Sequence, residues 1–219
     1  MTVVAIDGPA GAGKSTVARA AARALGFRYL DTGAMYRAIA LAAIERDLPL
    51  DDAEGLGKLA STVELDVDEN SVRLDGRIVT DRIRDADVTE AVSKVSAHST
   101  VRNALVGRQR DMAGHTNVVI EGRDIGSTVF PDAEVKLYLT ASLDERARRR
   151  CEDLGMPCDD ATIREVRASI EERDRADSRR TNSPLRRHDD AAELDTTDLT
   201  LAQVVDEVVR LVREATRDD

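Results

Sequence analysis

Residues 3–16, VVAIDGPAGAGKST, join a short apolar run to a glycine-rich loop and then to a helix-forming segment. Residues 8–15 fit the pattern G-x-x-x-x-G-K-[ST], in which successive backbone N–H groups surround phosphate oxygens. Glycines allow the tight bend, and the positive end of a helix expected from Lys14 to about Leu25, with Gly26 as its stop, favours an anion. The stretch therefore predicts a strand, a phosphate loop and a helix that together bind a nucleoside triphosphate.

Length and charge limit what the rest of the chain does. The 219 residues suit one domain with an insertion or a mobile lid. A formal net charge of −10 argues against a nucleic-acid coat, which needs a basic face. Only four residues are lysines, so nearly all positive charge is arginine, which suits forked contacts with phosphate, although a GC-rich genome would give the same bias.

Targeting signals and metal-ligand patterns are both missing from the sequence. Neither an export signal nor an apolar run of membrane-spanning length is found, so we expect a cytoplasmic protein that binds no membrane. Reduced thiols are then expected for Cys151 and Cys158, the two cysteines. Six residues separate them, which is not a zinc-ligand spacing, and the three histidines lie elsewhere, so we expect no metal knuckle.

Strands and helices alternate along most of the chain. Besides the first strand, apolar runs predict strands at 28–30, 118–120, 135–139 and about 193–195, and amphipathic patterns predict helices after residue 31 and from about 201 to 213. This order predicts an α/β fold with five parallel strands flanked by helices. Between 63 and 81 the pattern changes to short alternating runs with turns at 68–70 and 75–76, which predicts a small antiparallel β insertion.

Two further segments leave predicted strands at the edge where ligands bind in open α/β sheets. Glu121-Gly122-Arg123-Asp124 directly follows the strand at 118–120. Asp31-Thr32-Gly33 opens a helix that carries Tyr36 and Arg37. A polar turn is the alternative for the first segment, and core packing is the alternative for Tyr36, because the chain has only five aromatic residues.

Residues 142–180 are dense in charge and contain no aromatic residue. The spacing of Arg173, Asp177 and Arg180 is four and then three, which predicts one shared helical face with two guanidinium groups on either side of a carboxylate. Such a group suits a phosphate next to a sugar hydroxyl. The alternative is a solvated, salt-bridged helix pair.

Four segments, read together, resemble bacterial cytidylate kinases: GPAGAGKS (8–15), LDTGAMYR (30–37), EGRDIGSTVFPDAEVK (121–136) and RDRADSRR (173–180). The resemblance covers essentially the whole chain, in order and at matching intervals. Ser127 stands where relatives more often have threonine. The interior of the last motif, at Arg175-Ala176, differs from some relatives, which leaves open which additional lid arginine reaches the transferred phosphoryl group.

The resemblance implies a single P-loop nucleoside monophosphate kinase unit. Its core would be residues 1–31, 114–145 and 181–219, its monophosphate-binding region 32–113 with the β insertion at about 63–81, and its lid 146–180. The implied activity is phosphoryl transfer from ATP to CMP or dCMP with Mg²⁺, and we expect a monomer with small-molecule partners and no nucleic acid.

The same resemblance implies roles for individual residues. Lys14, Arg123 and Arg180 would be catalytic, and Ser15 would hold Mg²⁺. ATP would be bound by the loop and the start of its helix, Gly8, Pro9, Ala10, Gly11, Ala12, Gly13, Lys14, Ser15 and Thr16. CMP would be bound by Thr32, Tyr36, Arg37, Ser93, Arg102, Glu121, Arg123, Asp124, Arg173, Asp177 and Arg180, with Ser93, Arg102 and Asp124 at the cytosine edge and Arg173 with Asp177 at the sugar.

The chemistry of phosphoryl transfer agrees with this set. A phosphate acceptor is mostly ionised near neutral pH, since its second pKa is about 6, so no general base is required and the histidines need no role. Two alternatives remain at this stage. A kinase for UMP would need a different acceptor site, and one for an alcohol would also need a base. A guanine-dependent switch would be expected to contain N-K-x-D, which this sequence lacks.

Overall fold

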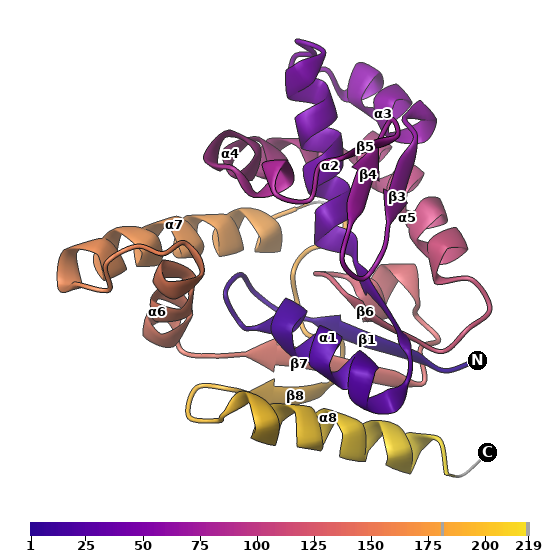
Figure 1. Ribbon diagram of the computed structural model, residues 1–219, viewed down its shortest axis with the longest axis vertical. Coiled ribbons are helices and arrows are strands. Elements are labelled where there is room, and N and C mark those ends of the chain that lie inside the picture. The colour runs from indigo at the N-terminus through magenta and orange to yellow at the C-terminus, as the bar shows by residue number, and fades with distance from the viewer. Residues whose placement is uncertain (181, 218–219) are drawn as a thin grey trace. The chain divides into compact units, whose positions relative to one another are not determined.

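The computed structural model describes residues 1–180 and 182–217 and contains a parallel and an antiparallel sheet (Figure 1). The parallel sheet has the order β2-β6-β1-β7-β8. Its strands are β1 (Val3–Asp7), β2 (Arg28–Asp31), β6 (Val118–Glu121), β7 (Val135–Thr140) and β8 (Ala192–Asp195). The predicted α/β fold and its five strands are confirmed.

The central strand β1 is buried along its whole length. Its Val4 pairs with Val119 of β6 on one side and with Val135 of β7 on the other. A strand that is covered on both faces and paired at both edges contacts no water, which explains its continuous apolar run. The phosphate loop, residues 8–13, begins where this strand ends.

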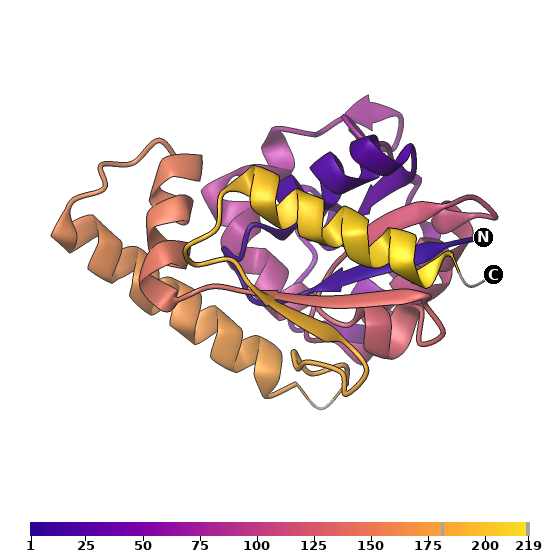
Figure 2. The same cartoon turned by 90° about the horizontal axis from the view of Figure 1, so that it is seen from below.

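The chain forms two compact units, and the first comprises residues 1–27 and 117–219. In this unit α1 (Lys14–Leu25) and α8 (Leu201–Ala215) lie side by side on one face of the sheet (Figure 2). The helices α6 (Leu143–Asp153) and α7 (Asp160–Ser178) pack against each other and follow β7, and a short π-helical turn, η2 (Ile125–Val129), follows β6.

The second unit comprises residues 28–116. Its longest buried element is α2 (Thr32–Glu45), against which α3 (Ala53–Thr62), α4 (Ala86–Val95) and the 3₁₀ turn η1 (Arg82–Arg84) pack. The helix α5 (Ser99–Ala113) packs on α3. The predicted insertion is confirmed as an antiparallel sheet of β3 (Leu65–Val67), β4 (Val72–Leu74) and β5 (Arg77–Ile78).

No helix in the described part of the chain has both the length and the apolar character that a membrane crossing needs.

Gly8 is where the loop leaves the sheet, and its backbone explains why glycine stands there. Its φ is 149°, and a Cβ at this position would lie 2.0 Å from the carbonyl oxygen of Leu139 in β7. Gly26, which ends α1, also has a positive φ, of 69°, but a Cβ there would meet nothing within 4 Å. The first glycine is required by a close approach of two backbones, and the second only by its backbone conformation.

This contrast predicts different costs for two alanine substitutions. Gly26→Ala should lower the free energy of unfolding by about 1 kcal/mol, the scale of left-handed strain alone. Gly8→Ala should cost more than about 3 kcal/mol, because a backbone carbonyl cannot rotate away from the added methyl group. Chemical denaturation of the two variants measures both values, and equal costs would contradict the close approach at Gly8.

Candidate functional site

The phosphate loop ends in a helix whose first turn is open to an anion. Gly11 and Gly13 have φ values of 75° and 81°, and Gly13 is the N-terminal cap of α1. The first turn of α1 contains no acidic residue, so its positive end is not neutralised by its own side chains. Lys14 is only 6% exposed, and its ammonium donates a hydrogen bond of 2.7 Å to the carbonyl of Pro9.

Charged residues from distant segments surround Lys14. Burial lowers the pKa of Lys14 to about 7, the positive charges of Arg123 and Arg173 act in the same direction, and Glu121 and Asp174 oppose them. The positive charges of Arg123 and Arg173 are therefore close enough to disfavour the protonated form of Lys14. An arrangement of this kind favours a polyanionic ligand, whose charge would relieve the repulsion.

Asp7, the last residue of β1, was not identified from the sequence as a site residue. Its carboxylate accepts hydrogen bonds of 2.8 Å from the backbone N–H groups of Ile125 and Gly126. Burial raises the pKa of Asp7 to about 6 and the charge of Asp124 adds to this, whereas the two N–H donors and Lys14 oppose it. Asp7 thereby holds the segment that follows β6 beside the phosphate loop. Its position immediately before Gly8 was the signal that could have identified it.

Among the described acidic residues of this unit, Asp177 is the most deeply buried, at 2% exposure. It accepts a hydrogen bond of 3.1 Å from Nε of Arg123 and forms an ion pair with Arg180. The sequence predicted a carboxylate between guanidinium groups, and Arg180 is one of the predicted partners. The hydrogen bond from Arg123 was not predicted.

The expectation that Arg173, Asp177 and Arg180 share a helical face is wrong for Arg180. The helix α7 ends at Ser178 and Arg179 caps it. The backbone N–H of Leu185 then bonds to the carbonyl of Asp177 at 2.9 Å, so the chain returns past the helix end. Arg180 therefore reaches Asp177 from beyond the helix. Arg173 lies on α7, and its charge acts on Lys14.

The second unit holds its own arginine site at the start of α2. Asp31 caps this helix by accepting from the N–H of Ala34 at 2.8 Å, and its other oxygen pairs with Nη2 of Arg37 at 2.9 Å. Nε of Arg37 is buried without a hydrogen-bond partner among the described residues. Thr32, the first residue of α2, is 2% exposed. This guanidinium is oriented by Asp31 and still has a donor to offer.

Tyr36 and Arg102 contact each other in the same unit. The guanidinium carbon of Arg102 lies 5.3 Å from the centre of the Tyr36 ring, and both side chains are buried. Nη1 of Arg102 donates to the carbonyl of Ser96 at 3.4 Å, and Oγ of Ser96 donates to the carbonyl of Ser93 at 3.3 Å. Tyr36 is therefore packed in the core, as the alternative interpretation had it. Its ring also makes a cation–π contact with Arg102.

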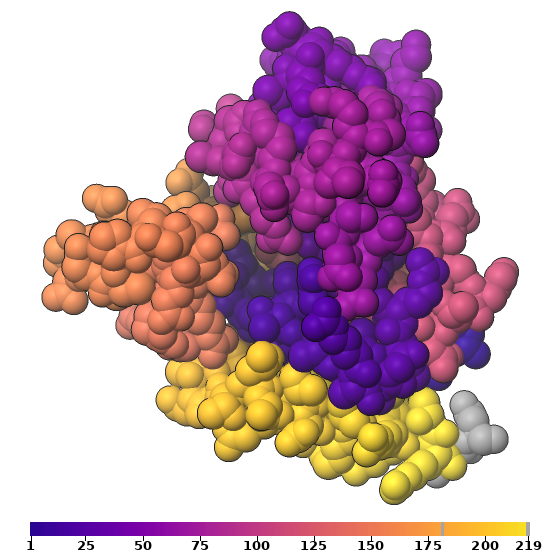
Figure 3. Space-filling model, in the orientation of Figure 1, coloured from indigo at the N-terminus to yellow at the C-terminus, as the bar shows by residue number. Residues whose placement is uncertain are grey.

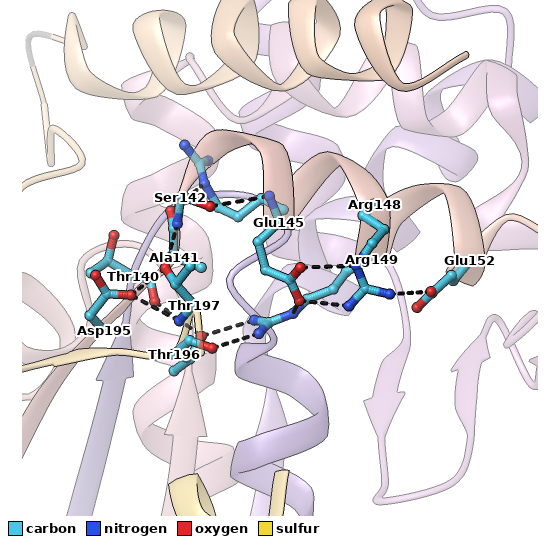
Figure 4. A network of polar contacts seen from close by, with 11 residues as sticks. Thr140, Ala141, Ser142, Glu145, Arg148, Arg149, Glu152, Asp195, Thr196 and Thr197 are labelled. Atoms are coloured by element: carbon cyan, nitrogen blue, oxygen red, sulfur yellow. Dashed lines mark hydrogen bonds and ion pairs between the residues drawn. The ribbon is translucent and has the colours of Figure 1, made fainter. Parts of the chain in front are cut away.

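A polar network joins the ends of β7 and β8 to α6 (Figure 4). Arg149 donates to the hydroxyl and the carbonyl of Thr196, at 2.9 and 2.7 Å, and to Glu145 at 2.8 Å. The N–H of Thr196 bonds to the carbonyl of Thr140. Nη1 of Arg149 also lies 3.6 Å from the position a Cβ on Gly13 would take. The sequence contains three consecutive arginines here, 148–150, and their pattern does not indicate which one faces the phosphate loop.

A family model and individual known proteins point to the same family for this chain. The model of the cytidylate kinase family matches residues 4–214. A cytidylate kinase from Caldanaerobacter subterraneus subsp. tengcongensis is 47% identical over 99% of this chain and 96% of its own length. One from Halalkalibacterium halodurans is 46% identical over 96% of this chain and 97% of its own length.

Some relatives are longer proteins. A bifunctional pantoate ligase/cytidylate kinase from a Synechococcus species is 50% identical over 97% of this chain, which matches 41% of that protein. The chain thus spans about two fifths of the length of this bifunctional relative. Since the family model matches nearly every residue, including both units and all the segments described above, the chain belongs to the cytidylate kinase family.

Proposed function

We propose that the chain transfers the γ-phosphoryl group of ATP to the phosphate of CMP or dCMP, and that the residues around Lys14 carry out the transfer. The observation that supports this most directly is the concentration of positive charge at Lys14, Arg123 and Arg173 beside a helix end that is open to anions. Family membership over residues 4–214 supports CMP as the acceptor.

The reaction needs alignment and charge neutralisation more than proton transfer. An oxygen of the acceptor phosphate attacks the γ-phosphorus, and the bond to the β,γ-bridging oxygen breaks. The attacking oxygen is already ionised, since the second pKa of a phosphate ester is about 6. The phosphate loop holds the triphosphate by its N–H groups, and Lys14, Arg123 and Arg180 stabilise the charge that spreads over the moving group.

The residues present fit a magnesium ion that arrives with ATP. Mg²⁺ prefers oxygen ligands and commonly takes only one or two from the protein, with phosphates and water as the others. Ser15 is exposed in the first turn of α1 and offers a hydroxyl oxygen. In the described residues no group of three or more His, Cys, Asp or Glu could enclose an ion by itself. When bound, the ion would neutralise triphosphate charge, while Lys14 and the loop position the phosphates.

We assign the monophosphate contacts residue by residue, on chemical grounds. Arg37 suits the acceptor phosphate, because Asp31 orients its guanidinium and its Nε has no partner among the described residues. Asp124 is a buried acceptor that suits the amino group of cytosine. The remaining assignments are Ser93 and Arg102 at the base, Arg173 and Asp177 at the sugar, Arg123 and Arg180 at the phosphate, and Thr32, Tyr36 and Glu121 as further contacts. Residues 146–180 would act as the closing lid.

The activity itself is tested by supplying ATP, Mg²⁺ and one nucleoside monophosphate at a time. We expect ADP release with CMP and dCMP, together with CDP or dCDP as the identified product, and kcat/KM values for UMP, AMP and GMP that are lower by orders of magnitude. A preference for UMP, or ADP release without a phosphorylated acceptor, would contradict the proposal.

The assignment of Asp124 predicts a loss of base discrimination. Cytosine offers an amino donor where uracil offers a carbonyl, and a site built around such a hydrogen bond can discriminate by up to about 10⁴-fold. Asp124→Asn keeps the volume but presents both an acceptor and a donor, so the CMP to UMP ratio of kcat/KM should fall at least about tenfold. Asp132→Asn, an exposed carboxylate in the same segment, is the matched control. An unchanged ratio in Asp124→Asn would exclude Asp124 from base recognition.

The low pKa of Lys14 predicts proton uptake when ATP binds. Above a pH of about 7 the buried amine is increasingly neutral, and a bound polyanion raises its pKa, so binding at pH 8 should take up part of a proton and weaken as the pH rises further. Calorimetric titration at pH 8, in buffers of different ionisation enthalpy, measures this uptake. Lys14→Met should abolish it, and Lys58→Met, an exposed lysine on α3, should not. Equal uptake in wild type and Lys14→Met would contradict the assignment.

A further inference from the structure

Ala10, in the middle of the phosphate loop, contacts the α6–α7 helix pair through both its backbone and its side chain. Its N–H donates a hydrogen bond of 3.1 Å to Oδ1 of Asp174 in α7. Its carbonyl accepts one of 3.0 Å from Nη1 of Arg146 in α6. Its methyl group belongs to the small apolar cluster of that helix pair, which consists of Ala10, Ala147 and Ile170, with Leu143, Ile163 and Val166 packed against it. Both backbone groups and the side chain of one residue are thus held by the same two helices.

Arg146 connects this contact to the sheet and to α7. Besides the bond to Ala10, its Nε donates to the carbonyl of Ala141, directly after β7, at 3.1 Å, and its Nη1 forms an ion pair with Asp174. The two charged side chains are 11% and 18% exposed, so water competes weakly with their pairing. The backbone of Arg146 comes so near the loop that a Cβ on Gly11 would lie 2.9 Å from its carbonyl oxygen.

The residue of α7 that contacts Ala10 directly follows a positively charged residue of that helix. Asp174 follows Arg173, whose charge lowers the pKa of Lys14, while the carboxylate of Asp174 acts on Lys14 in the opposite sense. Burial raises the pKa of Tyr138 in β7, the charge of Asp174 adds to this, and Arg123 and Arg146 oppose it. Moving Asp174 away from Ala10 would therefore move Arg173 away from Lys14.

We infer that Asp174 is a positioning residue: paired with Arg146, it attaches the α6–α7 helix pair to Ala10 and so couples the position of this pair to the conformation of the phosphate loop. In Figure 3 the orange surface of residues 143–178 adjoins the indigo surface of the N-terminal residues of the same unit. ATP bound by the loop would stabilise the attached helix pair, and the attached pair would strengthen ATP binding by the same factor.

The amide of Ala10 reports on this attachment directly, without any activity measurement. Residue-resolved hydrogen exchange should show the Ala10 N–H exchanging at least about tenfold faster in Asp174→Ala. The exchange rate of the Ala10 N–H should increase less in Asp174→Asn, because this variant keeps an acceptor oxygen and loses only the charge. The amide of Val4 in the buried strand β1 serves as the reference for global opening. The matched control is Glu171→Gln, which removes an exposed ion pair with Arg175 on the same helix and should leave Ala10 unchanged.

Binding and kinetic measurements test whether the position of the helix pair is coupled to ATP binding. Only this coupling rests on the proposed function. Asp174→Asn should raise the Kd of a non-hydrolysable ATP analogue and the KM for ATP about tenfold, with the KM for CMP changed less than twofold. Adding Arg146→Lys to Asp174→Asn should change the ATP values by less than about twofold, because both side chains act on one residue.

These outcomes distinguish a failure of the attachment at Ala10 from a failure of the proposed CMP kinase activity. Faster exchange at Ala10 with weaker analogue binding would support the attachment even if CMP were not phosphorylated. Unchanged exchange at Ala10, equal acceleration at Ala10 and Val4, or unaltered affinity for the analogue would overturn it.

Discussion

One buried carboxylate, Asp7, connects the phosphate loop to the segment that follows β6. It ends the central strand, precedes the first glycine of the loop, and accepts two backbone N–H groups from the segment after β6. Its pKa is raised to about 6, so between about 4 and 6 the folded protein binds more protons than the unfolded chain. The contribution of Asp7 to the free energy of unfolding therefore falls as pH rises through this window. The protein keeps an ionised group in its interior at neutral pH where an apolar residue could not hold both segments.

Four arginines described above are each oriented by a carboxylate. Arg37 pairs with Asp31, Arg123 and Arg180 pair with Asp177, and Arg146 pairs with Asp174. Such pairing restricts long side chains before a ligand is bound, which reduces the entropy lost on binding. Because Arg123 and Arg180 share one carboxylate, these three side chains keep a net positive charge in a chain whose overall net charge is −10. Asp31, Asp174 and Asp177 thus serve to place basic side chains.

The order of strands and helices could be predicted because each depends on local patterns. Val3–Asp7 is an unbroken apolar strand that ends in a glycine loop, and the turn at Asp75-Gly76 lies between two short strands, as the alternation indicated. Contacts between distant segments could not be predicted in this way. Arg123 meets Asp177 across 54 positions, and Arg146 and Asp174 meet at Ala10 only after the sheet and two helices have formed. Helical spacing also assumed that α7 continues to Arg180, whereas the chain turns back after Ser178.

The contacts of Ala10 change how the phosphate-loop pattern should be interpreted for this chain. The pattern leaves four positions between its glycines unspecified, since their side chains do not bind phosphate. Here one of these positions, Ala10, packs against Ala147 and Ile170. The space between the two helices and the loop therefore limits the size of its side chain. A larger residue would separate the two helices from the loop, and glycine would leave a gap in their apolar cluster. A position that is free to vary across nucleotide-binding proteins is thus constrained in this one by a neighbour that takes no part in the motif.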